Sequence, residues 1–143
     1  MSIQKKGSNR TLAERAVNSS GWRWVPGMLT KSGLRILSVG EDWDGLFVGA
    51  IGTNTSKAHR GCADKCRPQD LDEPDLSDPA TLGCLLALVR EAWSDDQIYF
   101  GSSINSSHNS WSWVRRDGDE RPLGRGATEA EALVAALEAA SFR

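Results

Sequence analysis

The chain has 143 residues, of which 39% are hydrophobic, and its formal net charge at pH 7 is −2. This length is enough to bury one hydrophobic core without a structural metal or a disulfide, and the small charge excludes a general electrostatic attraction to nucleic acid or anionic lipid. The odd number of cysteines, three, and an N-terminus without an apolar segment favour a reducing cytoplasm over secretion.

The first 20 residues are polar, and their cationic side chains outnumber the acidic ones. Thr11 and Glu14 have the spacing of a capping box, which would begin a short helix over residues 11–17. The alternative is a segment that lies free of the core. We predict a flexible basic tail over residues 1–20, followed by a single domain over residues 21–143.

Segments 22–25, 34–39 and 46–51 are rich in aromatic and β-branched residues, which is typical of strands. A Pro-Gly pair ends the first segment, and an Asp-Gly pair connects the second to the third. We therefore expect these segments to form an antiparallel meander.

Residues 53–77 have neither helical nor strand periodicity and form a predicted long charged loop. Loops of this length are usually either functional or disordered. A basic run at residues 57–67 precedes an acidic run, and such runs most often lie on a solvated surface where they pair locally. The alternative is a binding site, for which the candidate residues are Lys57, Arg60, Lys65 and Arg67.

The same loop contains His59, Cys62 and Cys66 in the spacing H-x2-C-x3-C. Zinc is bound tetrahedrally by such nitrogen and thiolate ligands, but the loop supplies no fourth ligand. We therefore predict no cofactor and keep a zinc site at these residues as the alternative. Cys84, within a predicted helix, is interpreted as a small core residue.

A buried helix is predicted over residues 78–93, and the rest of the chain is expected to pack around it. Asp78 is a suitable N-cap and Pro79 then occupies the first helical position. Its apolar stripe consists of Leu82, Leu85, Leu86 and Val89. The run is shorter than the roughly 20 apolar residues that a membrane span requires, so no membrane partner is predicted.

Residues 97–104 and 110–115 are predicted strands on either side of a polar loop. Thr128 and Glu131 fit a capping box that begins a second helix. The face of this helix opposite its leucine stripe is alanine and glutamate, which places the helix on the surface of the core. The predicted fold class is α+β, with an antiparallel sheet in the order βββ-α-ββ-α packed by two amphipathic helices.

Tryptophan occurs twice in an i, i+2 pair, at Trp22 and Trp24 and again at Trp111 and Trp113. Each pair lies on one face if its segment is a strand. We favour the interpretation that both pairs line the core beneath the helices, because a sheet under two helices needs large residues. If a pair instead faced solvent beside arginine, it would be a candidate site for stacking bases or for anchoring a protein partner.

Three segments of the chain resemble one group of proteins. They are PDLSDPATLGCLLALVREAW at residues 74–93, SWSWV at 110–114 and ATEAEALVAALEAA at 127–140. Together they resemble small phage and prophage proteins that carry a phage ABA sandwich domain, over about residues 73–141. The resemblance implies a bacteriophage or prophage protein in the host cytoplasm, and it implies no catalytic residues, because the general function of that group is unknown.

The sequence contains neither the strand–turn–helix elbow of a serine hydrolase nor a glycine-rich phosphate loop. We therefore predict no catalytic residues and a non-enzymatic function. The leading hypothesis is a phage or prophage accessory protein that binds a host or phage protein and thereby modulates a host system. The alternative is a nucleic-acid-binding module that uses the basic tail and the basic run at 57–67.

Overall fold

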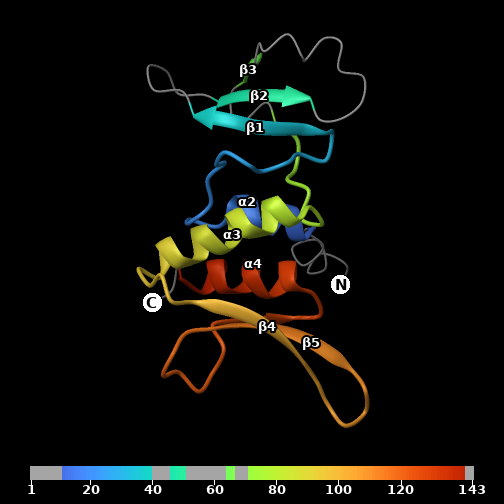
Figure 1. Ribbon diagram of the computed structural model, residues 1–143, viewed down its shortest axis with the longest axis vertical. Coiled ribbons are helices and arrows are strands. Elements are labelled where there is room, and N and C mark those ends of the chain that lie inside the picture. Colours follow the sequence, from blue (N-terminus) through green and yellow to red (C-terminus); the bar gives the residue numbers. More distant parts are fainter. Residues whose placement is uncertain (1–10, 40–45, 51–63, 67–70, 141–143) are drawn as a thin grey trace, which may run out of the picture. The chain divides into compact units, whose positions relative to one another are not determined.

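The computed structural model describes residues 11–39, 46–50, 64–66 and 71–140 (Figure 1). Helices alternate with short antiparallel strands, which confirms the α+β class. The elements are α2 (Leu12–Asn18), β1 (Leu34–Val39), β2 (Leu46–Ala50), β3 (Asp64–Cys66), α3 (Pro79–Ala92), β4 (Tyr99–Ile104), β5 (Ser110–Arg115), β6 (Gly124–Gly126) and α4 (Glu129–Ala140). The strands form two three-stranded sheets, in the orders β1-β2-β3 and β4-β5-β6.

The chain divides into two compact units. Unit 1 contains the described residues up to Arg23 and from Leu85 onward, and unit 2 is Trp24–Cys84. The predicted single domain over residues 21–143 is thus made of two units, and the boundary at residues 84 and 85 falls inside α3.

Unit 2 contains the sheet β1-β2-β3, in which β2 pairs antiparallel with both neighbours. The register between β1 and β2 shifts between Ile36 and Ser38, so Leu37 lies at a bulge and is half exposed. Met28, Ile36 and Val48 are buried and form the apolar core of this unit. The strand β3 lies within residues 53–77, which were predicted to be a loop.

Residues 22–25 were predicted to be the first strand, and they are not a strand. The Trp22 amide donates to the carbonyl of Ser19, and the Met28 amide donates to the carbonyl of Val25. The segment therefore runs between two turns, which occupy backbone groups that a sheet would otherwise pair. Trp24 is 8% exposed. The side chain is therefore buried, although its segment is not paired in a sheet.

Unit 1 contains the sheet β4-β5-β6, with α4 packed on one face (Figure 1). Close approach is possible because β6 has glycine at its first and last positions. A Cβ atom built on Gly124 would lie 2.5 Å from the backbone nitrogen of Ala136, closer than any real contact. Ala132 and Ala136 are fully buried. The prediction that α4 lies on the surface of the core is therefore wrong, because its alanine face is what allows it to approach the sheet.

The opposite side of α4 is covered by α2 and by the chain near the end of α3. The indole nitrogen of Trp93 donates to the carbonyl of Ala136 at 2.9 Å, and a Cβ on Gly21 would meet both Leu137 and Ala92. Arg15 of α2 forms an ion pair with Glu138 of α4 at 2.6 Å. With cover on two sides, α4 is buried over most of its surface.

The helix α2 lies within the segment predicted to be a flexible tail. Thr11 accepts from the Glu14 amide, and the Glu14 carboxylate accepts from the Thr11 amide, so the capping box suggested by the sequence is present. Ala13 and Ala16 are buried. Residues 11–18 are therefore part of unit 1, and residues 1–10 lie outside the described part of the chain.

The helix α3 begins as predicted, with the Thr81 amide donating to the Asp78 carboxylate at 2.9 Å. Its most buried side chains are Leu85, Leu88 and Val89, whereas Leu82 and Leu86 are only half-buried. The predicted stripe is thus rotated toward Leu88. Within the described residues, no helix combines the length and the apolar character needed to cross a membrane.

Candidate binding face of unit 1

The two faces of the β4-β5-β6 sheet are distinguished by the glycines of β6. A Cβ on Gly124 would point at α4, so Gly124 and its partner on β5, Val114, face the helix. Because side chains alternate along a strand, Trp111 and Trp113 must point to the opposite face. Ser112 and Val114 are buried whereas both tryptophans are partly exposed, which agrees with this assignment.

The interpretation that Trp111 and Trp113 line the core is therefore wrong. On β5 and β6 the helix-facing positions hold small residues, because α4 approaches these strands too closely for an indole to fit beneath it. We call the side of the sheet opposite α4 the outer face. It is formed by the side chains of Tyr99, Ser103, Trp111, Trp113, Arg115 and Arg125.

Trp113 is held flat against the neighbouring strand β4. Its registered partner there is Gly101, and a Cβ on Gly101 would lie 2.7 Å from the indole, so only glycine leaves room for the ring. The indole nitrogen donates to Ser103 Oγ at 2.8 Å. The ring of Tyr99 meets the indole edge-on, with centroids 5.7 Å apart. These contacts fix one orientation of Trp113 before any partner binds.

Two arginines lie over the two indoles. The guanidinium carbon of Arg115 is 4.8 Å from the ring centroid of Trp113, and that of Arg125 is 4.7 Å from the ring centroid of Trp111. Both distances are within the range of a favourable cation–π interaction. The outer face therefore combines aromatic rings and cations in alternation, and the residues contributed to it by these strands include no acid.

The outer face contains three residue types that are common in protein interfaces. Tryptophan, tyrosine and arginine are the residues that most often dominate the energy of a protein interface. Neither imidazole, thiol nor carboxylate is among the side chains that the described strands contribute to this face. Across the described residues, no group of three or more histidine, cysteine or acidic side chains is placed to hold a metal ion.

The remaining predicted site residues are not brought to this face by any described contact. Lys65 and Cys66 belong to β3, where their backbones pair with Phe47 and Leu46. The other predicted binding and metal-binding residues lie outside the described residues: Lys57, His59, Arg60, Cys62 and Arg67. The basic-run and zinc hypotheses therefore stay predictions.

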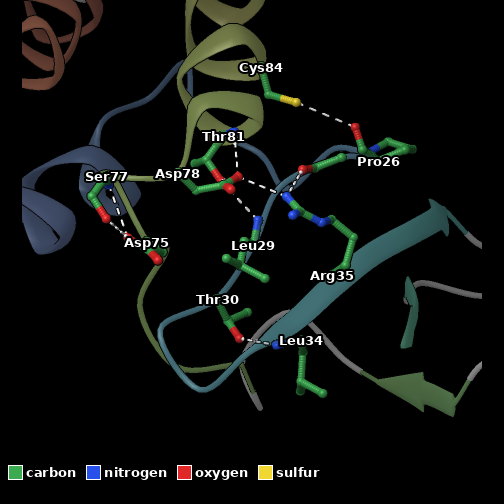
Figure 2. Close-up of polar contacts among 11 residues, drawn as sticks. Pro26, Leu29, Thr30, Leu34, Arg35, Asp75, Ser77, Asp78, Thr81 and Cys84 are labelled. Atoms are coloured by element: carbon green, nitrogen blue, oxygen red, sulfur yellow. Dashed lines mark hydrogen bonds and ion pairs between the residues drawn. The ribbon is translucent and has the colours of Figure 1, made fainter. Parts of the chain in front are cut away.

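A second polar cluster surrounds the start of α3 in unit 2 (Figure 2). The Asp78 carboxylate accepts from Arg35 at 2.8 Å and from both the amide and the hydroxyl of Thr81 at 2.9 Å. Arg35 also donates to the carbonyl of Gly27, and the Leu29 amide donates to the Thr81 hydroxyl. These hydrogen bonds join the start of α3 to the segment that leads into β1.

Protonation in this cluster follows from the same contacts. Partial burial alone would raise the pKa of Asp78, but the hydrogen bonds from Arg35 and Thr81 outweigh it and hold the pKa below its ordinary value. Burial, with the nearby charge of Asp78, raises the pKa of the Cys84 thiol. The thiol therefore stays protonated and contacts the carbonyl of Pro26 at 3.4 Å, which is unsuited to a nucleophile.

An open depression of about 490 Å³ lies beyond the end of α3. Its lining residues are engaged in the turn that follows the helix. Arg90 donates to the carbonyl of Ile98 at 2.8 Å, and the Arg90 carbonyl accepts from the Asp95 amide. The depression is thus a feature of the turn, and it presents no arrangement of groups aimed at a ligand.

Trp111 and Trp113 were candidate binding residues from the sequence, whereas Tyr99, Gly101 and Arg125 were not. The usable signal was the Gly-Arg-Gly sequence of β6, since two glycines at i and i+2 indicate a close approach by another element. That approach identifies the helix-facing side of the sheet and hence the side to which Arg125 belongs. Comparison of the chain with family models, with curated proteins and with solved structures gives no match.

Proposed function

We propose that this protein is a non-enzymatic binding protein that recognises a protein partner through the outer face of unit 1. The observation that carries the proposal is that Trp111 and Trp113 lie on the side of the sheet away from α4, where they are partly exposed and held in place by neighbouring side chains. A preorganised aromatic surface loses little conformational entropy on binding, which favours affinity.

The biological setting is part of the same proposal. The resemblance of about residues 73–141 to small phage and prophage proteins supports an accessory protein that acts in the host cytoplasm on a host or phage protein. The proposed setting depends on that resemblance, whereas the proposed binding surface depends on the geometry of β4, β5 and β6.

The small number of cations on the outer face favours a protein partner over nucleic acid. Nucleic-acid binding without base readout depends on many cations along the backbone, and the strands contribute two to the outer face, Arg115 and Arg125.

The test compares capture of proteins from a host lysate by the wild-type chain, Trp111→Ser and Leu37→Ser. Leu37 is a matched control because it is a large apolar side chain, 50% exposed, on a strand of unit 2. We expect a protein that is retained by wild type and by Leu37→Ser and is lost with Trp111→Ser. Affinities of the purified partner should then differ by about 2 kcal/mol between the two variants.

Circular dichroism should show that both variants keep the wild-type fold, because neither position is fully buried. Equal capture by all three chains would contradict the proposal. So would a catalytic turnover by the purified protein that survives Trp111→Ser.

A further inference from the structure

We infer that the outer face binds an acidic segment of its protein partner, whose carboxylates are bound by Arg115 and Arg125. This inference rests on the proposed function and adds the chemistry of the partner. It follows from the position of the two guanidinium groups over the indoles and from the absence of a described carboxylate partner for either group.

Stacking on an indole orients a guanidinium without using its hydrogen-bond donors. Those N–H groups lie in the plane of the guanidinium and point away from its edge, whereas the cation–π contact uses its flat face. The guanidinium carbons of Arg115 and Arg125 lie over Trp113 and Trp111, and neither guanidinium has a described hydrogen-bond acceptor, so their accessible N–H groups can donate to a planar, bidentate acceptor. A carboxylate has that geometry.

The positive charge of these two arginines is not neutralised within the described part of the chain. Four other arginines each have a carboxylate partner. The pairs are Arg15 with Glu138, Arg23 with Glu91, Arg35 with Asp78, and Arg116 with Asp119. Among the described residues, Arg115 and Arg125 take part in no ion pair.

Arg115 is also incompletely satisfied as a hydrogen-bond donor. Its Nε atom is buried and has no acceptor among the described residues. Buried donors without a partner are uncommon, and desolvation of a cation without a counter-charge is unfavourable. A carboxylate at the accessible edge of this guanidinium would offset the missing counter-charge and would be bound more strongly than in bulk water.

A phosphate backbone would supply similar oxygen acceptors, but the face is less suited to the bases that come with it. One side of each indole is already covered by a guanidinium. A base that stacked there would have to displace an arginine. A peptide can instead place a carboxylate at the edge of each guanidinium while leaving the cation–π contacts intact.

The test uses a fluorescein-labelled peptide of about eight residues in which Glu alternates with Thr, so that in an extended strand all carboxylates lie on one side. Two further probes are the same peptide with Lys in place of Glu and an oligothymidylate of about ten nucleotides, which would occupy a typical single-strand site. Binding to the full-length chain is measured by fluorescence anisotropy at low and high ionic strength.

We expect the Glu peptide to bind and its dissociation constant to rise about tenfold with Arg125→Gln, because a charge-assisted bidentate contact is lost. Arg121→Gln is the matched control, since it removes the same charge from an exposed position in the loop between β5 and β6, and we expect less than about a twofold change. Affinity for the Glu peptide should also fall as added salt screens the charges.

Absence of Glu-peptide binding up to about 1 mM at low salt would overturn the inference. Equal affinity for the Lys peptide would overturn it as well, as would tighter binding of the oligothymidylate, which would assign the face to single-stranded nucleic acid. A partner that depends on Trp111 but is still captured by Arg125→Gln would overturn the acidic assignment and leave the proposed function standing.

Discussion

Asp78 combines two stabilising roles at one carboxylate. It caps α3 through the Thr81 amide, and it is the counter-ion of Arg35, which lies on β1. Because the pKa of Asp78 is lowered on folding, its ionised form stabilises the native state above the unfolded pKa of about 3.9. That contribution is lost as the pH falls through the lower, folded pKa.

Asp78→Asn separates these roles, because asparagine remains a good N-cap but cannot neutralise Arg35. We expect the variant to be less stable than wild type by about 1–2 kcal/mol at pH 7, from loss of the charge-assisted hydrogen bond. The difference should shrink as the pH falls below about 4 and disappear below the lower, folded pKa, where the carboxyl of wild-type Asp78 is neutral as well. Urea unfolding between neutral and acidic pH measures this effect.

Arg35→Gln is the complementary variant for the same measurement. In that background Asp78→Asn should have a smaller effect at pH 7, because the ion pair is already absent. A constant difference between Asp78→Asn and wild type at every pH would contradict the assigned role of Arg35.

Gly124 shows how one residue sets the distance between two elements. An alanine there would place its Cβ against the backbone of Ala132 and Ala136, which cannot shift without moving α4 as a whole. We expect Gly124→Ala to lower the free energy of unfolding by about 3 kcal/mol, because the overlap involves backbone atoms. Chemical denaturation monitored by circular dichroism measures it.

Gly83→Ala is the control for Gly124→Ala. Gly83 is exposed within α3, and a Cβ there would meet nothing within 4 Å. This substitution should raise stability by about 0.5–1 kcal/mol, because alanine has the higher helix propensity. Similar effects of the two substitutions would show that the close approach of α4 to β6 is not as described.

At the scale of elements, α2 is a packed helix in a segment that was predicted to be a flexible tail. Ala16 is fully buried, whereas Val17 next to it is 39% exposed. Ala16→Glu should destabilise the protein by more than about 3 kcal/mol, since it buries an unpaired charge. Val17→Glu should change stability by less than about 0.5 kcal/mol, as is usual for surface positions.

Thermal unfolding of both variants distinguishes the two descriptions of this segment. If residues 11–18 were a tail, the substitutions would have equal and negligible effects. The expected large difference between adjacent positions requires a helix that buries one side.

Most element positions could be predicted from the sequence because their signals are local. The capping of α3 by Asp78 and the strand bounds of β1 and β5 depend on neighbouring residues, and they are confirmed. For α4 the Glu131 amide does donate to Thr128, but the Glu131 carboxylate accepts from the amide of Ala127 and not from that of Thr128. That detail depends on the path of the chain before the helix.

The faces of the elements could not be predicted, because a face is decided by distant packing partners. The pattern Trp-Ser-Trp-Val in β5 predicts that the tryptophans lie on one face of the strand and the serine and valine on the other. It does not indicate which face packs against a helix. Because of their size, the tryptophans were assigned to the core beneath the helix. The glycines of β6 and the alanines of α4 instead bring helix and sheet too close together for an indole to fit between them. Trp111 and Trp113 were thus recognised as candidate binding residues by residue type, whereas the favoured interpretation placed them on the helix-facing side of the sheet.

At the scale of the whole molecule, two compact units share one continuous helix. The unit boundary falls between Cys84 and Leu85, inside α3. The longest apolar run of the sequence therefore contributes its first turn to unit 2 and its buried leucines to unit 1. Most of the surface of α4 is also buried. Its small side chains gave a weaker hydrophobic pattern in the sequence than the leucines of α3, so the sequence did not indicate that α4 is a core helix.

The alternation along β5 has a consequence for how such a protein can change over time. The side chains of Ser112 and Val114 face α4 and are constrained by its packing. The side chains of Trp111 and Trp113 lie on the outer face and are partly exposed. Under the proposed function, substitutions at Trp111 and Trp113 would change which partner is bound, whereas Ser112 and Val114 maintain the packing of α4 on the sheet. Substitutions could then accumulate at the two outer-face positions while the fold is preserved.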